Sequence, residues 1–166
     1  ENFTVTVRDP SGASDTRVIS INFTGSNDTP IAEASVAEVS EDDSIKGTLP
    51  GSDADAGATL SYGLDSPAPA GFNLKDDGSW TFDASHEAYQ SLAEGQTLTL
   101  TIPYVVVDEF GAASGNTLTI TVTGVNDAAI LGSADVQLTE TDEPLSTGGT
   151  LSISDVDSPA TFVAQS

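Results

Sequence analysis

The chain has 166 residues, a length that favours one domain accompanied by parts of others. It contains 26 Asp and Glu residues against 4 Lys and Arg residues, so its formal net charge is −22. Nucleic acid and anionic membranes are excluded as expected partners, because both attract clustered cations. The absence of cysteine excludes disulfides and thiolate metal sites. No apolar run is long enough to cross a bilayer, so we expect no direct membrane insertion.

The N-terminal half of the chain shows the alternation of apolar and polar residues that is typical of β-strands. Ile19, Ile21 and Phe23 lie on one face of a first predicted strand. Further strands are expected at residues 33–39, 45–51, 58–64, 71–75 and 79–83. The last two form a predicted hairpin, because Asp77-Gly78 between them is a strong tight-turn signal.

The C-terminal half continues the pattern after one interruption. Residues 85–93 are the only segment with a helical pattern, and we expect a brief helix there. Strands are predicted at 97–107 and 116–124, and Pro103 indicates an edge position or a bulge in the first. Short strands at regular spacing predict an all-β, Ig-like Greek-key β-sandwich.

An internal repeat organises the chain. Residues 24–28 (Thr-Gly-Ser-Asn-Asp) match residues 123–127 (Thr-Gly-Val-Asn-Asp) at an offset of 123 − 24 = 99. After Glu41 the offset becomes 102, which we attribute to a three-residue insertion near 142–147. Tandem β-sandwich repeats are therefore expected, divided into the C-terminal part of a preceding repeat (1–28), a complete repeat (29–128) and the N-terminal part of a following repeat (129–166).

Acidic residues recur at matching positions near both linkers between repeats. Strands that alternate in direction bring Asp53, Asp55 and Asp108 to the end of the sandwich that adjoins Asn27 and Asp28. The matching second set is Asn126, Asp127, Asp155 and Asp157, with Glu41 as an addition. Ca²⁺ takes six to eight oxygen ligands from carboxylates and carbonyls. Solubility alone would explain a single surface acid, but the recurrence of the set favours a metal site at each junction.

Three segments resemble the VCBS repeats of large bacterial RTX-type adhesins: residues 53–60, 76–82 and 125–128. The linkers are similar to those of cadherins, in which Asn-Asp is followed by Pro, as in residues 27–30. The second linker has Ala128-Ala129 instead. This resemblance implies a cadherin-like fold with Ca²⁺ between repeats. It implies Asn27, Asp28, Asp53, Asp55 and Asp108 as ligands at the first junction, and Glu41, Asn126, Asp127, Asp155 and Asp157 at the second.

The resemblance further implies a calcium-binding extender (stalk) repeat of a bacterial surface adhesin, exported to the cell surface by type I secretion. Its expected partners are the neighbouring repeats, and a host or surface ligand is expected to bind elsewhere in the parent protein. The alternative is a carbohydrate- or peptide-binding module of the same adhesin. We expect no enzymatic activity, because His86 is the only histidine and no catalytic set accompanies it.

Overall fold

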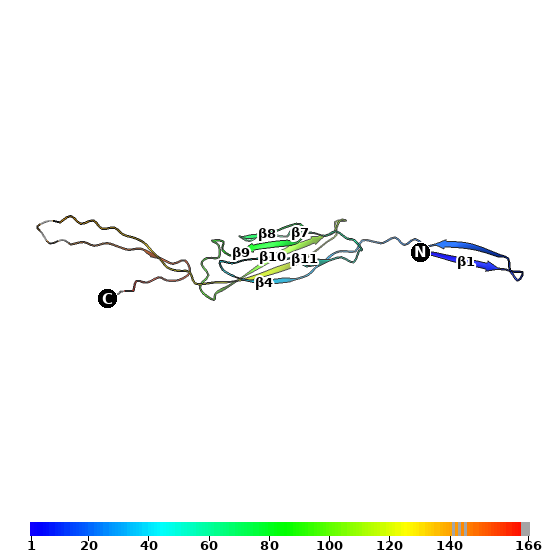
Figure 1. The fold of residues 1–166 in the computed structure, drawn as a ribbon, viewed down its shortest axis with the longest axis horizontal. Helices are drawn as coiled ribbons and strands as arrows, with labels where there is room; N and C mark the ends of the chain where they lie inside the picture. The colour runs from blue at the N-terminus through cyan, green and yellow to red at the C-terminus, as the bar shows by residue number, and fades with distance from the viewer. Residues whose placement is uncertain (141, 143, 145, 164–166) are drawn as a thin grey trace.

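The computed structural model describes residues 1–140, 142, 144 and 146–163. Its central part is a β-sandwich, with a β-hairpin at the N-terminal extremity and an extended segment at the opposite one (Figure 1). Within the described ranges, no helix is long and apolar enough to cross a membrane. Glu143, inside the expected insertion, lies outside the described residues.

The sandwich consists of two sheets with connections that pass between them. The first sheet has the strand order β4 (Ser35–Ser40), β11 (Ala113–Thr123), β10 (Thr97–Val107) and β7 (Ser61–Leu64). The second has the order β5 (Ser44–Thr48), β9 (Ser79–Asp83) and β8 (Phe72–Leu74), and β3 (Ile31–Ala32) pairs separately with β6 (Gly51–Ser52). The all-β sandwich prediction is confirmed.

The core lies between the two sheets and follows from the alternation of side chains. Leu118, Ile120 and Val122 of β11 are fully buried and belong to the same cluster as Trp80 and Phe82 of β9. Packing two apolar faces together in this way is the main driving force for a sandwich. Trp80 is also one of the core aromatic residues, being 5% exposed.

Tyr104 of β10 is 1% exposed and ties two strand ends together. Its hydroxyl donates hydrogen bonds to the carbonyl of Glu33 and, at 3.0 Å, to that of Pro50. A buried phenol needs such partners. The side chains of Trp80 and Tyr104 are therefore too buried to form an exposed aromatic surface for ligand binding.

The prediction of a brief helix at residues 85–93 is wrong. The segment forms successive turns, in which Tyr89 N–H donates to the His86 carbonyl at 3.0 Å and Leu92 N–H to the Tyr89 carbonyl at 3.1 Å. These turns bury Tyr89 against Phe82 and let its hydroxyl bond to the Ala70 carbonyl. Tertiary packing overrides a local pattern that is too short to nucleate a helix.

Pro103 lies inside β10 at the point where pairing with β7 ends. The Pro103 carbonyl accepts a hydrogen bond from Asp65 N–H at 3.1 Å, on the β7 side of the strand. Pairing with β7 covers only Tyr104 to Val107, so the missing proline N–H faces no strand partner. The proline therefore occupies the edge position that the sequence offered as one of two alternatives.

The terminal segments repeat the pairing of the sandwich. β1 (Asn2–Arg8) and β2 (Ser14–Ser20) pair Arg8 with Ser14, as β10 and β11 pair Val107 with Ala113, and 107 − 8 = 113 − 14 = 99. β12 (Ile130–Leu131) and β13 (Ile153–Ser154) likewise repeat the pairing of β3 with β6. These strand pairings match one another at the same offsets as the sequence repeat.

Candidate functional site

The first linker connects to two acidic loops of the sandwich. The side-chain amide of Asn27 donates to Asp108 Oδ2 at 2.9 Å. The main-chain N–H of Asp28 donates to Asp55 Oδ2 at 2.8 Å, and Asp55 N–H donates to Asp53 Oδ1 at 2.8 Å. The five residues predicted for this junction therefore come together at one end of the sandwich.

The turn after β10 orients Asp108. Its Oδ1 accepts hydrogen bonds from the main-chain N–H groups of Phe110 at 2.9 Å and Ala112 at 2.8 Å. Gly111 closes this turn with a φ of 88°, a left-handed conformation that glycine adopts without strain. The hydrogen bond from Asn27, followed by those from the turn, lowers the pKa of Asp108. The carboxylate is therefore held ionised and pointed at the linker.

A hollow of about 370 Å³ adjoins this junction. It is lined by residues of the linker, of the Asp55 loop and of the turn after β10, including Asn27, Asp55 and Glu109. Glu109 Oε2 accepts a hydrogen bond from Thr59 N–H at 2.8 Å. Glu109 was not among the residues predicted for this junction, although it directly follows Asp108 in the sequence.

The second junction reproduces the first. Asp127 N–H donates to Asp157 Oδ2 and Asp157 N–H donates to Asp155 Oδ1, both at 3.3 Å. These bonds match those of Asp28, Asp55 and Asp53 through the offsets 99 and 102. A side-chain hydrogen bond between the two carboxyls lowers the pKa of Asp155 and raises that of Asp157. A hollow of about 220 Å³ lies beside them.

Glu41 reaches the second junction from the sandwich side. It is 1% exposed, and its Oε2 accepts a hydrogen bond from Val125 N–H at 3.1 Å. Burial raises the pKa of Glu41, and the charge of Asp127 adds to the shift. A buried acid next to a second acid is costly unless a cation or a proton neutralises it.

Two residues do not join these sets. Asn126 is exposed, and its amide donates to the adjacent Asp127 carbonyl at 2.9 Å rather than to an acid of the next repeat. Asp83, at the end of β9, uses Oδ1 to accept from Ser85 N–H and from Ser85 Oγ. These contacts lower the pKa of Asp83, and none of them involves another acid of the junction.

The residues at both junctions fit a hard cation. Five buried side-chain polar atoms lack a hydrogen-bond partner in the described part of the chain, namely Glu41 Oε1, Asp53 Oδ2, Asp127 Oδ2, Asp157 Oδ1 and Trp80 Nε1. Four of the five are carboxylate oxygens of predicted ligands. Buried polar atoms almost always have partners, and a hard cation is a partner that these carboxylate oxygens would fit.

The same residues do not form a complete cage. Among residues 1–140, 142, 144 and 146–163, no group of three or more His, Cys, Asp or Glu side chains is close enough to hold a metal ion by itself. Calcium also accepts amide and main-chain carbonyl oxygens. Any site here needs such neutral oxygens, of which the Asn27 amide offers one.

One family of known protein domains matches more than half of this chain. The sequence profile of the bacterial cadherin-like domain family matches residues 27–124, which contain the whole sandwich and the first junction. The chain belongs to this family. No curated protein matches the cadherin-like chain.

Solved structures support the same fold. The cadherin-like chain is 14% identical to the extracellular domain of protocadherin GammaB4, covering 95% of this chain and 29% of that one with a TM-score of 0.53. It is 15% identical to the protocadherin gammaB7 EC3-6 cis-dimer structure, covering 95% and 42%, also with a TM-score of 0.53. The chain thus spans less than half the length of either, and identities this low show the fold alone.

Proposed function

We propose that this cadherin-like chain is a calcium-binding extender repeat of a secreted bacterial surface adhesin of the VCBS/RTX type. The observation that carries the proposal is the set of four buried, unpartnered carboxylate oxygens at the two junctions. Ca²⁺ would be held by Asn27, Asp28, Asp53, Asp55 and Asp108 at the first junction, and by Glu41, Asp127, Asp155 and Asp157, with Asn126, at the second. Bound there, the ion supplies positive charge and shared coordination across the linker.

The role of the chain's own residues is mechanical. Each junction joins acids of a linker to acids of a loop in the next repeat, so only the docked arrangement assembles the set. Binding to that arrangement alone stabilises it by mass action. Extracellular calcium modules bind with Kd values of roughly 10⁻⁴–10⁻³ M, so such sites fill outside the cell and stay empty in the cytosol. This difference suits export by type I secretion followed by folding and stiffening outside.

We propose a non-enzymatic role. His86 is exposed, and its Nδ1 accepts a hydrogen bond from Ala88 N–H at 3.2 Å. The proposed partners are therefore neighbouring repeats, and the surface ligand binds elsewhere in the parent adhesin.

Thermal unfolding in calcium and in chelator tests the proposal. At a hundredfold excess of calcium over Kd, binding adds about 2.7 kcal/mol to the free energy of unfolding. Asp55→Asn and Asp157→Asn should reduce the calcium-induced rise in Tm, whereas Asp77→Asn should leave it intact. Asp77 lies in the hairpin turn, where its Oδ1 accepts from Ser79. An equal Tm in calcium and chelator for the unmodified chain contradicts the proposal.

A second candidate function is recognition of a carbohydrate or peptide. A hollow of about 420 Å³ lies on the sheet of β5, β9 and β8, with Lys46, Asn73, Lys75 and Thr81 among its lining residues. Neither lysine has an ion pair among the described residues, although the chain has 26 acids. A glycan array in calcium, with Lys46→Ala/Lys75→Ala as the comparison, tests this candidate. Binding that is lost in the double variant would favour it over a purely mechanical role.

A further inference from the structure

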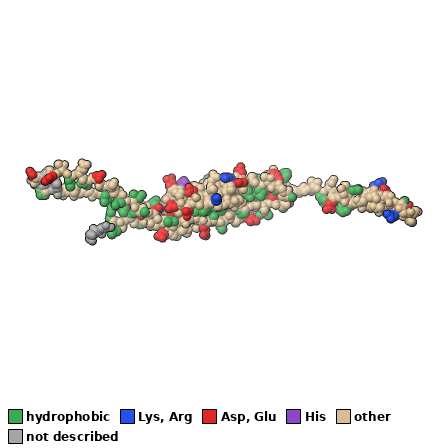
Figure 2. All heavy atoms as spheres, viewed as in Figure 1, with side chains coloured by type: hydrophobic (Ala, Val, Ile, Leu, Met, Phe, Trp, Pro, Cys, Tyr) green, Lys and Arg blue, Asp and Glu red, His purple; other side chains and the backbone are tan. Residues whose placement is uncertain are grey.

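The face of the sandwich formed by β5, β9 and β8 carries both lysines of the chain. Lys46 lies in β5 and Lys75 directly follows β8, and both side chains are exposed. They are the only Lys or Arg residues between residues 29 and 128. The one ion pair found in the described part of the chain, Arg17 with Asp15, lies in the N-terminal hairpin instead. Figure 2 shows the blue side chains of the sandwich on one face, with mostly uncharged atoms between them.

Two rows of outward-facing residues cross these three strands, and each row ends in a lysine. One row consists of Lys46, Thr81 and Asn73, and the other of Thr48, Ser79 and Lys75. Lys75 joins its row through a hydrogen bond from its N–H to the Ser79 carbonyl at 2.9 Å. From the spacing of strands and of alternate residues, the two lysines occupy diagonal corners with their Cα atoms about 12 Å apart. The groups between the lysines are hydroxyls and one amide.

The surface over these two rows is concave. The hollow of about 420 Å³ is lined by all six residues, and no Asp or Glu is among its lining residues. A second hollow, of about 460 Å³, shares Lys46 and Thr81 with the first and continues toward Asp83. The concavity therefore follows β9 for about 13 Å, the length of a five-residue strand. It is long enough for an extended ligand rather than a single small ion.

We infer that this face binds a carboxylate-bearing polysaccharide. Lys46 and Lys75 would pair with carboxylates along the polymer, since an ammonium group donates charge-assisted hydrogen bonds to such oxygens. The hydroxyls and the amide between them can both donate to and accept from sugar hydroxyls. An extended peptide gains most from an open strand edge, which these outward side chains do not offer. The inference rests on the second candidate function given above and does not depend on the calcium sites.

Asp77 lies in the turn beside Lys75 and opposes an anionic ligand. Its Oδ1 accepts hydrogen bonds from Ser79 N–H at 2.9 Å and from Ser79 Oγ at 2.5 Å. These bonds and, to a smaller extent, the charge of Lys75 lower the pKa of Asp77, so the carboxylate is ionised at neutral pH. Asp77→Asn keeps an oxygen that can accept the same bonds and removes the charge. It should therefore strengthen binding, whereas loss of the lysines should weaken it.

Titration with oligogalacturonate in calcium-free buffer tests the inference. At 0.15 M salt the Debye length is about 8 Å, so the more distant acids of the chain are screened. Lys46→Gln/Lys75→Gln should raise Kd about tenfold, and Lys46→Arg/Lys75→Arg should restore binding. Asp77→Asn should lower Kd by about two- to fivefold. No calcium enters this measurement, so its outcome is separate from that of the calcium-dependent unfolding.

NMR spectra recorded during the titration locate the site and show that each variant is folded. The amides of Lys46, Thr81 and Asn73 should shift. Those of Thr101 and Thr119, which are direct partners in the other sheet, should not. Absence of binding by the unmodified chain, or equal Kd values for it and the Lys→Gln variant, would overturn the inference. Equally tight binding of polyglutamate would overturn the choice of a polysaccharide.

Discussion

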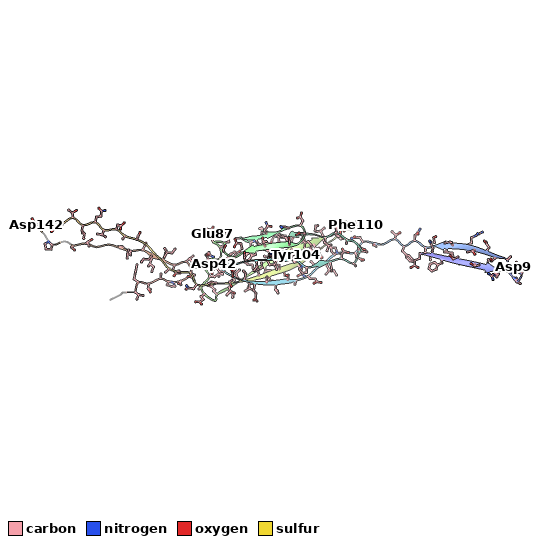
Figure 3. All side chains as sticks on the ribbon, in the orientation of Figure 1. Asp9, Asp42, Glu87, Tyr104, Phe110 and Asp142 are labelled. Atoms are coloured by element: carbon pink, nitrogen blue, oxygen red, sulfur yellow. The ribbon has the colours of Figure 1, made fainter. Side chains whose placement is uncertain are left out.

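Glu41 is the residue at which burial and charge conflict most directly. It lies at the end of the sandwich near Asp42, which is labelled in Figure 3, but unlike Asp42 its side chain is buried. One oxygen accepts from Val125 and the other has no partner. The contribution of Glu41 to the stability of the fold therefore depends on whether a cation or a proton neutralises its carboxylate.

Replacement of Glu41 by Gln should have opposite effects on stability in chelator and in calcium. In chelator, Glu41→Gln removes a buried charge and its repulsion with Asp127, so we expect stabilisation of about 1 kcal/mol, or a Tm higher by roughly 4–8 °C. In calcium the variant loses a ligand, so its calcium-induced rise in Tm should be smaller. Thermal unfolding measures both effects. Glu87→Gln, at an exposed residue of the same end, is the control.

The pH dependence in chelator should carry two opposite contributions. The folded pKa of Glu41 is raised above its ordinary value of 4.5, so this residue destabilises the fold at neutral pH and the penalty fades as the pH falls through the raised pKa. The folded pKa of Asp108 is lowered, so its contribution is complete above its ordinary value of 3.8 and is lost as the pH falls below that value.

We therefore expect Tm in chelator to rise as the pH falls from 7 toward 5 and to drop steeply below about 4. Glu41→Gln should reduce the rise, because Asp157, whose pKa is also raised, still contributes to it, and should leave the drop. Asn27→Ala removes the main cause of the Asp108 shift and should make the drop shallower. A Tm that falls steadily from pH 7 in the unmodified chain would contradict the assignment of Glu41.

Among the strands, β5 and β9 pack so closely that a substitution at Gly47 tests the packing of the core. A Cβ added at Gly47 would lie 2.6 Å from Trp80 Cζ2, and the stacked Phe72 ring restricts the indole. Gly47→Ala should cost about 1–3 kcal/mol through overpacking. Gly63→Ala in β7 is the matched control, because its Cβ would meet Val105 at an ordinary 3.7 Å. Urea unfolding followed by Trp80 fluorescence measures both, and equal stabilities would contradict the packing.

Most strands could be predicted because alternation is a local property of the sequence. The predicted hairpin strands at 71–75 and 79–83 correspond to β8 and β9, and the strand at 97–107 has the bounds of β10. The segment 85–93 could not be predicted, since contacts with Phe82 and Ala70 determine its turns. The repeat predicted which segments meet at each junction, and the structure links Asp28 with Asp55 and Asp127 with Asp157, but it leaves Asn126 outside the second set. Which of their oxygens are buried without partners depends on tertiary packing that no local pattern encodes.

At the level of the whole molecule, we expect the first linker to be stiffer than the second, because only the first contains proline. Pro30 in the first linker is fully buried, and its ring fixes φ. The second linker has Ala129 at the equivalent position. Ala129→Pro should restrict the second linker as Pro30 restricts the first. Small-angle scattering in chelator should then show a longer and more uniform particle, and an unchanged distance distribution would contradict the prediction.

We expect divalent cations to bind where neighbouring repeats meet. Diffraction from crystals grown in calcium tests it most directly. We expect metal density at about 2.3–2.6 Å from oxygens of Asp53, Asp55 and Asp108, and again from those of Glu41, Asp127 and Asp157. Well-ordered junctions in which these carboxylates contact only water, with no metal density between them, would contradict it.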